Sequence, residues 1–166
     1  MNRRRFLALL PAALAAGCGF QLHRLDGIPF GSLYVDAPSG SVVAQRIRSI
    51  LVSNKNTRLA ATADEAEAVL KLVQEDRSKT ILSLSGAGRV TEYRLGLRLT
   101  YSVNSRDGRI LAEPENIELN RDMTYDDSLL LAKGAEEQLL YRDMEDGAAR
   151  RIVRRLQSIK PGNAPS

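Results

Sequence analysis

The clearest pattern in the chain is a strict alternation of apolar and polar side chains over residues 93–103, the stretch YRLGLRLTYSV. Every second side chain is apolar, namely those of Tyr93, Leu95, Leu97, Leu99, Tyr101 and Val103. A period of two over this length predicts a strand with one face on a core and the other in water. The strand is expected to end at Asp107-Gly108, a dipeptide that supplies the positive φ angles of a tight hairpin turn.

Two further strands are predicted beside this one. Upstream, residues 68–85 (AVLKLVQEDRSKTILSLS) form a long strand with an irregular middle, joined to the next strand by a turn at residues 86–88. Downstream, the alternation resumes near Ile117, after an interruption at Pro114. Because proline cannot donate a ladder hydrogen bond, this strand is predicted to be an edge strand or a bulged one. Residues 68–125 are therefore expected to form a three-stranded antiparallel meander.

Helices are predicted on both sides of the meander. In residues 43–51 the apolar positions follow helical spacing after Ser39 or Ser41, either of which is a suitable N-cap. A second helix is expected to start near residues 126–128, and its apolar stripe consists of Leu140, Met144, Ala148, Ile152, Leu156 and Ile159. A short strand, residues 32–37, precedes the first helix.

The predicted element order is thus β-α-β-β-β-α. This order favours an α+β fold, in which a four-stranded, mostly antiparallel sheet packs two helices on one face. That arrangement buries the apolar side of the sheet and the stripes of both helices together.

The N-terminal residues have the pattern of an export signal: arginines at residues 3–5, an uncharged run over residues 6–16 and small residues before Cys18. The run is shorter than the roughly 20 residues that a membrane-crossing helix needs. Cys18, the sole cysteine, follows the small residues as in a bacterial lipobox, although Ala15 stands where leucine is usual. In such signals the thiol takes a diacylglycerol, the chain is cut before the cysteine and the new amine is acylated. The alternative is a secreted protein with a free thiol.

The lipobox resemblance implies a protein tethered to a membrane without spanning it, since two or more acyl chains anchor stably. Gly19 follows the cysteine in place of the aspartate of an inner-membrane retention signal, which implies an outer-membrane anchor facing the periplasm. The stretch RRRFL leaves both general and twin-arginine export open. The expected organisation is a signal peptide (1–17), a lipidated tether (18–31), one domain (32–159) and a flexible tail (160–166).

Charge and composition argue against two classes of function. The chain has 24 basic and 20 acidic residues, but three arginines leave with the signal, so 21 basic residues remain against 20. A nucleic-acid-binding domain should keep a basic excess. The only cysteine is consumed by lipid and the only histidine, His23, lies in the tether, so the usual thiol and histidine sites of enzymes have no residues to use. No enzyme activity, metal or cofactor is expected beyond the acyl chains on Cys18.

Several segments together resemble the LptE family of lipopolysaccharide-assembly lipoproteins. They are GCGFQL at residues 17–22, TEYRL at residues 91–95 and LLAKGAE at residues 130–136, within the element order given above. The resemblance implies a partner of the large outer-membrane β-barrel LptD, in a one-to-one complex. It implies that the lipoprotein plugs the barrel, assists its assembly and binds lipopolysaccharide, with no covalent chemistry.

Lipid A carries phosphates, which arginine and lysine meet with charge-assisted hydrogen bonds. The resemblance places a lipid-contacting lysine at Lys133. Arg89, beside the glycine of a hairpin turn, is a second candidate, although the family's basic residue falls nearer Gly86. Arg94 and Arg98 lie on the polar face of the long strand and complete the candidate set. For each of the four the alternative is an ordinary solvated surface charge.

Other features have two interpretations. The RRIVRR stretch at residues 150–155 is either an anion-binding patch or, as we favour, the usual cations of a helix C-terminus. Residues 129–131, three leucines, either dock a partner or pack a helix start on the sheet. The alternatives for the whole protein are a structural envelope lipoprotein without a lipid ligand and a hydrolase whose site the sequence does not reveal.

Overall fold

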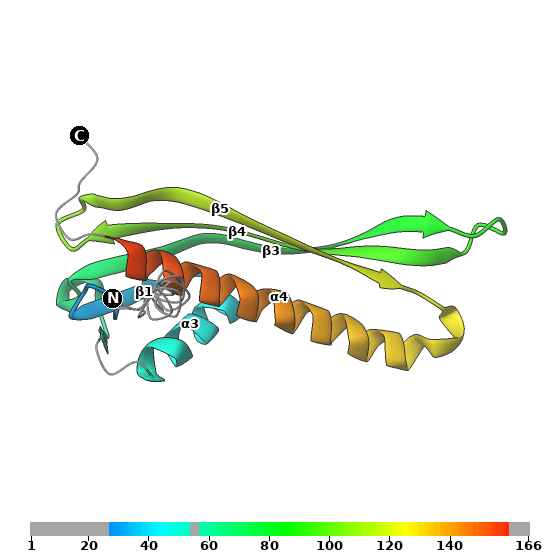
Figure 1. Ribbon diagram of the computed structural model, residues 1–166, viewed down its shortest axis with the longest axis horizontal. Coiled ribbons are helices and arrows are strands. Elements are labelled where there is room, and N and C mark those ends of the chain that lie inside the picture. The colour runs from blue at the N-terminus through cyan, green and yellow to red at the C-terminus, as the bar shows by residue number, and fades with distance from the viewer. Residues whose placement is uncertain (1–26, 54–56, 160–166) are drawn as a thin grey trace, which may run out of the picture.

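A long twisted sheet with both helices on one face forms the domain (Figure 1). The structure, a computed structural model, describes residues 27–53 and 57–159. Cys18, the signal peptide, most of the tether and the tail lie outside these residues. The predicted α+β class and the element order are confirmed, with two helices on a mixed sheet.

The sheet has five strands in the order β2-β1-β3-β4-β5. β1 (Ser32–Asp36) runs parallel to both β2 (Arg58–Leu59) and β3 (Ala68–Leu84). β3, β4 (Val90–Ser105) and β5 (Ile110–Thr124) form the predicted antiparallel meander. The prediction of four strands missed β2, because two residues are too few to show any periodicity.

Both long hairpins close with the same five-residue turn. In Ser85–Arg89 the N–H of Gly88 donates to the Ser85 carbonyl at 2.9 Å, and the N–H of Ser85 donates to the Arg89 carbonyl at 2.7 Å. Ser105–Arg109 repeats these bonds at 2.9 and 2.8 Å. Only the glycine has a positive φ, +75° at Gly88 and +85° at Gly108. The prediction that both Asp107 and Gly108 have a positive φ is therefore wrong. The loop between the two end residues of the turn has three residues, and such a loop needs a positive φ at one position only.

Irregular pairing marks Pro114, as its chemistry predicts. On β4, Tyr101 and Val103 are two residues apart, but their partners on β5, Glu115 and Ala112, are three apart. The extra residue forms a bulge that includes Pro114. β5 is also the edge of the sheet, so Pro114 lies at a bulge and on an edge strand, the two places in a sheet that tolerate a missing N–H.

A second bulge lies in the middle of β3. Leu72 pairs with Tyr101, whereas Gln74 pairs with Thr100, so Val73 is the additional residue. An extra residue moves every later side chain to the opposite face. Leu70 and Leu72 are buried before the bulge, whereas after it three charged side chains point toward the helices: those of Glu75, Arg77 and Lys79.

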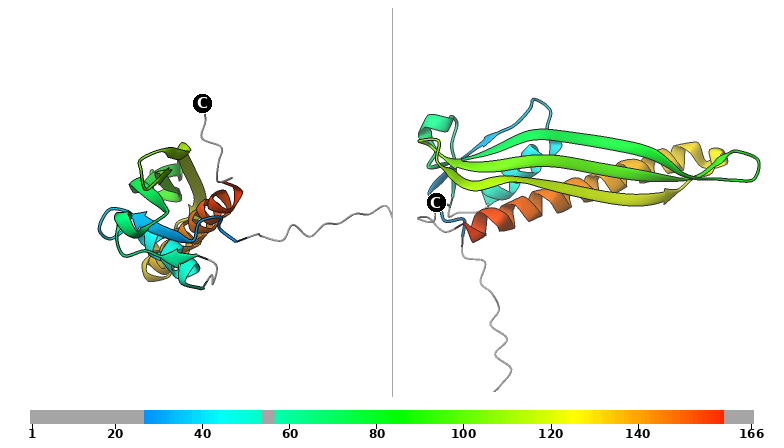
Figure 2. Two further views of the ribbon diagram at one scale, coloured as in Figure 1. Left: turned by 90° about the vertical axis from the view of Figure 1, so that its left-hand side faces the viewer. Right: turned by 90° about the horizontal axis from the view of Figure 1, so that it is seen from above.

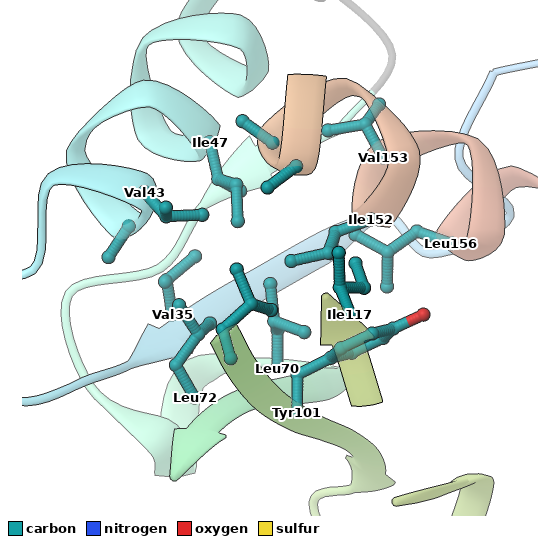
Figure 3. Close-up of a cluster of buried hydrophobic side chains, with 14 of the residues drawn as sticks. Val35, Val43, Ile47, Leu70, Leu72, Tyr101, Ile117, Ile152, Val153 and Leu156 are labelled. Carbon is teal, nitrogen blue, oxygen red and sulfur yellow. The ribbon is translucent and has the colours of Figure 1, made fainter. Parts of the chain in front are cut away.

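The core lies between the sheet and two helices, α3 (Val42–Ser53) and α4 (Leu130–Ser158). α4 runs along the three long strands, and α3 lies beside its C-terminal half, at the end of the sheet that carries β1 (Figures 1 and 2). Figure 3 shows Ile152 and Leu156 of α4 packed over Leu70, Tyr101 and Ile117 of the sheet. The predicted stripe of α4 is buried except for Leu140, which is half-buried. No helix in the described ranges is long and apolar enough to span a membrane.

Ser41, one of the two predicted caps, holds the start of α3. Its hydroxyl accepts the N–H of Ala44 at 3.0 Å and donates to the Glu75 carboxylate, which also accepts the N–H of Val43 at 3.4 Å. Because a lost cap leaves an N–H group unsatisfied, we expect Ser41→Ala to lower the free energy of unfolding by about 1 kcal/mol. Chemical denaturation measures this change. Ser39→Ala, an exposed serine two residues earlier, is the control and should change it by under about 0.5 kcal/mol.

Candidate functional site

The candidate site lies at the end of the molecule where the β3–β4 turn approaches the start of α4, which we call the distal end (Figure 1). There the N–H of Tyr125 donates to the Thr91 carbonyl at 2.8 Å. A hollow of about 250 Å³ is lined on one side by the hairpin and on the other by the connection from β5 to α4. Its residues are Ser85, Arg89, Val90 and Thr91 with Tyr125, Asp126, Asp127 and Ser128.

Asp126 is one of the two carboxylates that line this hollow, beside Asp127. It caps the short 3-10 helix Asp127–Leu129, accepting the N–H of Ser128 at 2.9 Å and the hydroxyl of Ser128 at 2.7 Å. These hydrogen bonds hold the pKa of the Asp126 carboxyl below its usual range; slight desolvation opposes them, and the nearby charges of Arg89 and Lys133 add to them. Two predicted cations from separate segments therefore lie close enough to this carboxylate for their charges to act on it, although neither forms a salt bridge with it.

Lys133 is held in place more firmly than a free surface lysine. Its ammonium donates to the Glu136 carboxylate at 2.8 Å and to the Thr124 hydroxyl at 3.1 Å, and its side chain is only 14% exposed. Two of its three N–H groups are thus engaged, which leaves one for a ligand. Arg89 forms no salt bridge within the described part of the chain.

Arg94 and Arg98 lie elsewhere, on the face of the sheet that the helices leave open. Arg94 makes a two-pronged ion pair with Asp122 of β5, with N–O distances of 2.8 and 2.9 Å, and this contact lowers the pKa of the Asp122 carboxyl. Arg98 lies 3.5 Å from the Glu118 carboxylate. The four candidate cations therefore form two separate pairs, and this second pair is already matched by cross-strand carboxylates.

A fifth cation, Lys79, was not among the predicted site residues. Its ammonium lies 4.3 Å above the ring of Tyr93 and 2.6 Å from the Glu137 carboxylate of α4. The hydrogen bond to Glu137 raises the pKa of Lys79, against the effect of desolvation. Tyr93 packs edge-on against Tyr125, with ring centroids 5.0 Å apart. The sequence could have revealed Lys79 only through the face of β3 on which it lies. That face cannot be assigned until the bulge at Val73 is located.

A known protein family matches most of the chain. The sequence profile of the family described as LptE, lipopolysaccharide-assembly, matches residues 30–156. The chain belongs to that family. The LPS-assembly lipoprotein LptE of Photorhabdus laumondii is 29% identical over 163 residues, which cover 95% of this chain and 88% of the relative.

Solved structures of two lipoproteins share the fold of this LptE-family chain. The solution structure of an uncharacterized lipoprotein B from Nitrosomonas europaea has a TM-score of 0.74 at 32% identity, covering 84% of this chain and 91% of the other. The crystal structure of the rare lipoprotein B from Shewanella oneidensis has a TM-score of 0.66 at 29% identity, covering 76% and 94%. The shared fold therefore extends over about three quarters or more of this chain and over more than nine tenths of each relative.

This LptE-family protein also exposes apolar side chains at its distal end. Leu131 is 91% exposed, and its neighbours Leu129 and Leu130 are more than half exposed. At the end of β3, Ile81 and Leu84 are more than half exposed as well. The interpretation of residues 129–131 as a helix start packed on the sheet is therefore wrong, whereas their docking to a partner stays a prediction.

Proposed function

We propose that this protein is an outer-membrane lipoprotein, anchored through acyl chains on Cys18 and facing the periplasm. It forms a one-to-one complex with the LptD β-barrel, assists the assembly of that barrel, and binds lipopolysaccharide. One observation carries the ligand proposal: Arg89 lines the hollow at the distal end, and Lys133 lies beside it on Thr124 and Glu136, in a chain whose family match spans residues 30–156.

The chemistry of the distal end suits reversible phosphate binding without covalent catalysis. A phosphate group entering the hollow would compete with Asp126, whose charge lies near both cations, and with Glu136, the ion-pair partner of Lys133. The Arg89 guanidinium can meet it with two parallel N–H donors, and Lys133 contributes its remaining N–H. Asp126 and Glu136 already compensate the charges of Arg89 and Lys133. A phosphate that binds must replace these carboxylates, so the affinity for the phosphate stays moderate and the ligand can be released.

The exposed leucines support the partner proposal. Contiguous apolar side chains on a protein surface mark sites of contact with another protein or with lipid. Among the described residues, six of the ten exposed large apolar side chains lie at the distal end, three around the start of α4 and three near the end of β3. We assign this surface to contact with the barrel.

Affinity purification of the lipidated protein from cell envelopes in mild detergent tests the partner. We expect one large β-barrel protein in equal amount, and we expect Cys18→Ser to move the protein out of the membrane fraction. Recovery of the lipoprotein alone, with no bound lipopolysaccharide, would instead support the structural lipoprotein without a ligand.

For the ligand, we expect Lys133→Ala and Arg89→Ala each to weaken lipopolysaccharide binding about tenfold, because each removes a hydrogen bond from a charged donor. Titration of the purified protein with lipopolysaccharide measures this. Arg142→Ala, which removes an exposed arginine from the middle of α4, should leave the affinity unchanged. Asp126→Asn keeps a good cap but removes the competing charge, so it should tighten binding. Equal affinities for all these variants would contradict the site.

A further inference from the structure

The open face of the sheet carries an uninterrupted array of polar residues. β4 residues on this face are Arg94, Gly96, Arg98 and Thr100, because the alternating leucines between them are buried against the helices. Cross-strand pairing adds Thr80, Ser78, Asp76 and Gln74 from β3 and Asp122, Asn120, Glu118 and Asn116 from β5. We call these twelve positions the polar grid, and none of them is apolar apart from the glycine.

Charges within the polar grid nearly balance. Arg94 pairs with Asp122 and Arg98 with Glu118, which leaves Asp76 as the one additional charge. Neutral partners also meet directly: the Thr100 hydroxyl donates to the Asn116 side-chain oxygen at 2.8 Å. The surface therefore has no strong field to attract either an anion or a cation, but it offers closely spaced donors and acceptors across three strands.

Gly96 makes a notch in the middle of the polar grid. A Cβ atom at this position would collide with the Ser78 hydroxyl oxygen and lie 3.2 Å from the Asn120 side-chain oxygen. The side chains around the notch enclose a hollow of about 180 Å³ between the two ion-paired rows, lined among others by Asp76, Arg98 and Glu118. The glycine thus opens access to polar groups that any larger residue would cover.

The polar grid is continuous with the distal end. Beyond Arg94 and Asp122 the next cross-strand pair is Glu92 and Thr124, and the Thr124 hydroxyl is the group that Lys133 contacts. The four β4 positions from 94 to 100 extend over about 20 Å at roughly 3.3 Å per residue. A ligand held by phosphate at Lys133 can therefore continue along the polar grid.

We infer that the polar grid binds the hydroxyl-rich saccharide of lipopolysaccharide, with the notch at Gly96 as its central contact. This inference rests on the proposed function, since the lipid A part must first bind at the distal end. Sugar hydroxyls both donate and accept, which matches a charge-balanced surface of mixed donors and acceptors. An apolar protein partner could bury little apolar area against the polar grid. A free phosphate would be repelled by the carboxylate that lies beside each arginine.

The test compares two ligands, lipopolysaccharide with its core sugars and lipid A without them, in titrations of the full-length protein. The double variant Ser78→Ala/Gly96→Ala fills the notch without the collision, and Ser78→Ala alone is its matched control. We expect the double variant to weaken binding of the sugar-bearing ligand about fivefold, as for the loss of one hydrogen bond, and to leave lipid A binding unchanged. Ser78→Ala alone removes one hydroxyl but leaves the notch open, so it should weaken binding of the sugar-bearing ligand less than the double variant does. Gln138→Ala, which removes an exposed amide on α4, should change neither affinity.

A second double variant keeps the test possible if Ser78→Ala/Gly96→Ala does not fold. Asn116→Ala/Asn120→Ala truncates two grid side chains on the edge strand and should give the same selective loss. Equal weakening for both ligands, or no weakening, would overturn the inference while leaving the distal site intact. Equal affinity of the natural protein for both ligands would overturn it as well. Failure of the natural protein to bind either ligand would remove the proposed function and the inference together.

Discussion

Replacing Arg77 by alanine is expected to lower the free energy of unfolding by about 3 kcal/mol. Its guanidinium pairs with the Glu145 carboxylate of α4, whose side chain is fully buried and whose other oxygen, Oε2, has no hydrogen-bond partner among the described residues. Without Arg77 the buried carboxylate would lose its one compensating charge. We take the lower end of the usual cost because Arg77 itself stays 38% exposed.

The adjacent residue of α4 provides a matched control. Asp146 pairs with Arg46 of α3 at 3.1 Å, but both side chains are about 40% exposed, so Arg46→Ala should cost under about 1 kcal/mol. The double variant Arg77→Met/Glu145→Leu should recover most of the stability, since an apolar pair removes the buried charge altogether. Denaturant titrations of all three variants measure these differences. A cost for Arg77→Ala no greater than that for Arg46→Ala would show that Glu145 is not effectively buried.

The second large effect is expected at Leu156, near the end of α4. Its side chain has no exposed surface and packs in the cluster of Figure 3. Leu156→Ala should cost about 2–5 kcal/mol, through lost burial and the cavity that remains. Thermal and chemical unfolding measure this value.

Leu131 on the same helix is the control for this substitution. It is 91% exposed, so Leu131→Ala should change stability by under about 0.5 kcal/mol. The same variant should weaken co-purification with the barrel if the exposed leucines contact it. A large stability loss at Leu131 would mean that this part of α4 is covered in the isolated protein.

Prediction from the sequence succeeded where one face of an element is buried and the other is wet. β4 alternates cleanly because its leucines meet the helices and its arginines meet water, and the stripe of α4 is equally plain. Pro114 was correctly placed in an edge strand and a bulge, since its missing N–H allows little else. In these cases a local property of the residues determines the outcome.

Prediction failed where the outcome depends on long-range register. The bulge at Val73 decides that Lys79 and Arg77 face the helices; the sequence indicates an irregular middle in this strand but not the position of the extra residue. The pairing of Arg94 with Asp122 follows from the register of β5, which residues far along the chain determine. The positions of Arg89 and Lys133 near one carboxylate, Asp126, likewise result from the topology, although each had been named separately as a candidate.

The length of the meander has a consequence for where the site can operate. The 17 residues of β3, at roughly 3.3 Å each, extend over about 56 Å, which exceeds the 40–45 Å thickness of a bilayer with its headgroups. β1, near the start of the described chain, lies at the opposite end of the sheet from the β3–β4 turn (Figure 1). A partner that held the sheet upright would place Arg89 at the far surface of the membrane while β1 stayed at the near one. The distance that the sheet spans would then determine, as much as the affinity does, from which leaflet the ligand can bind.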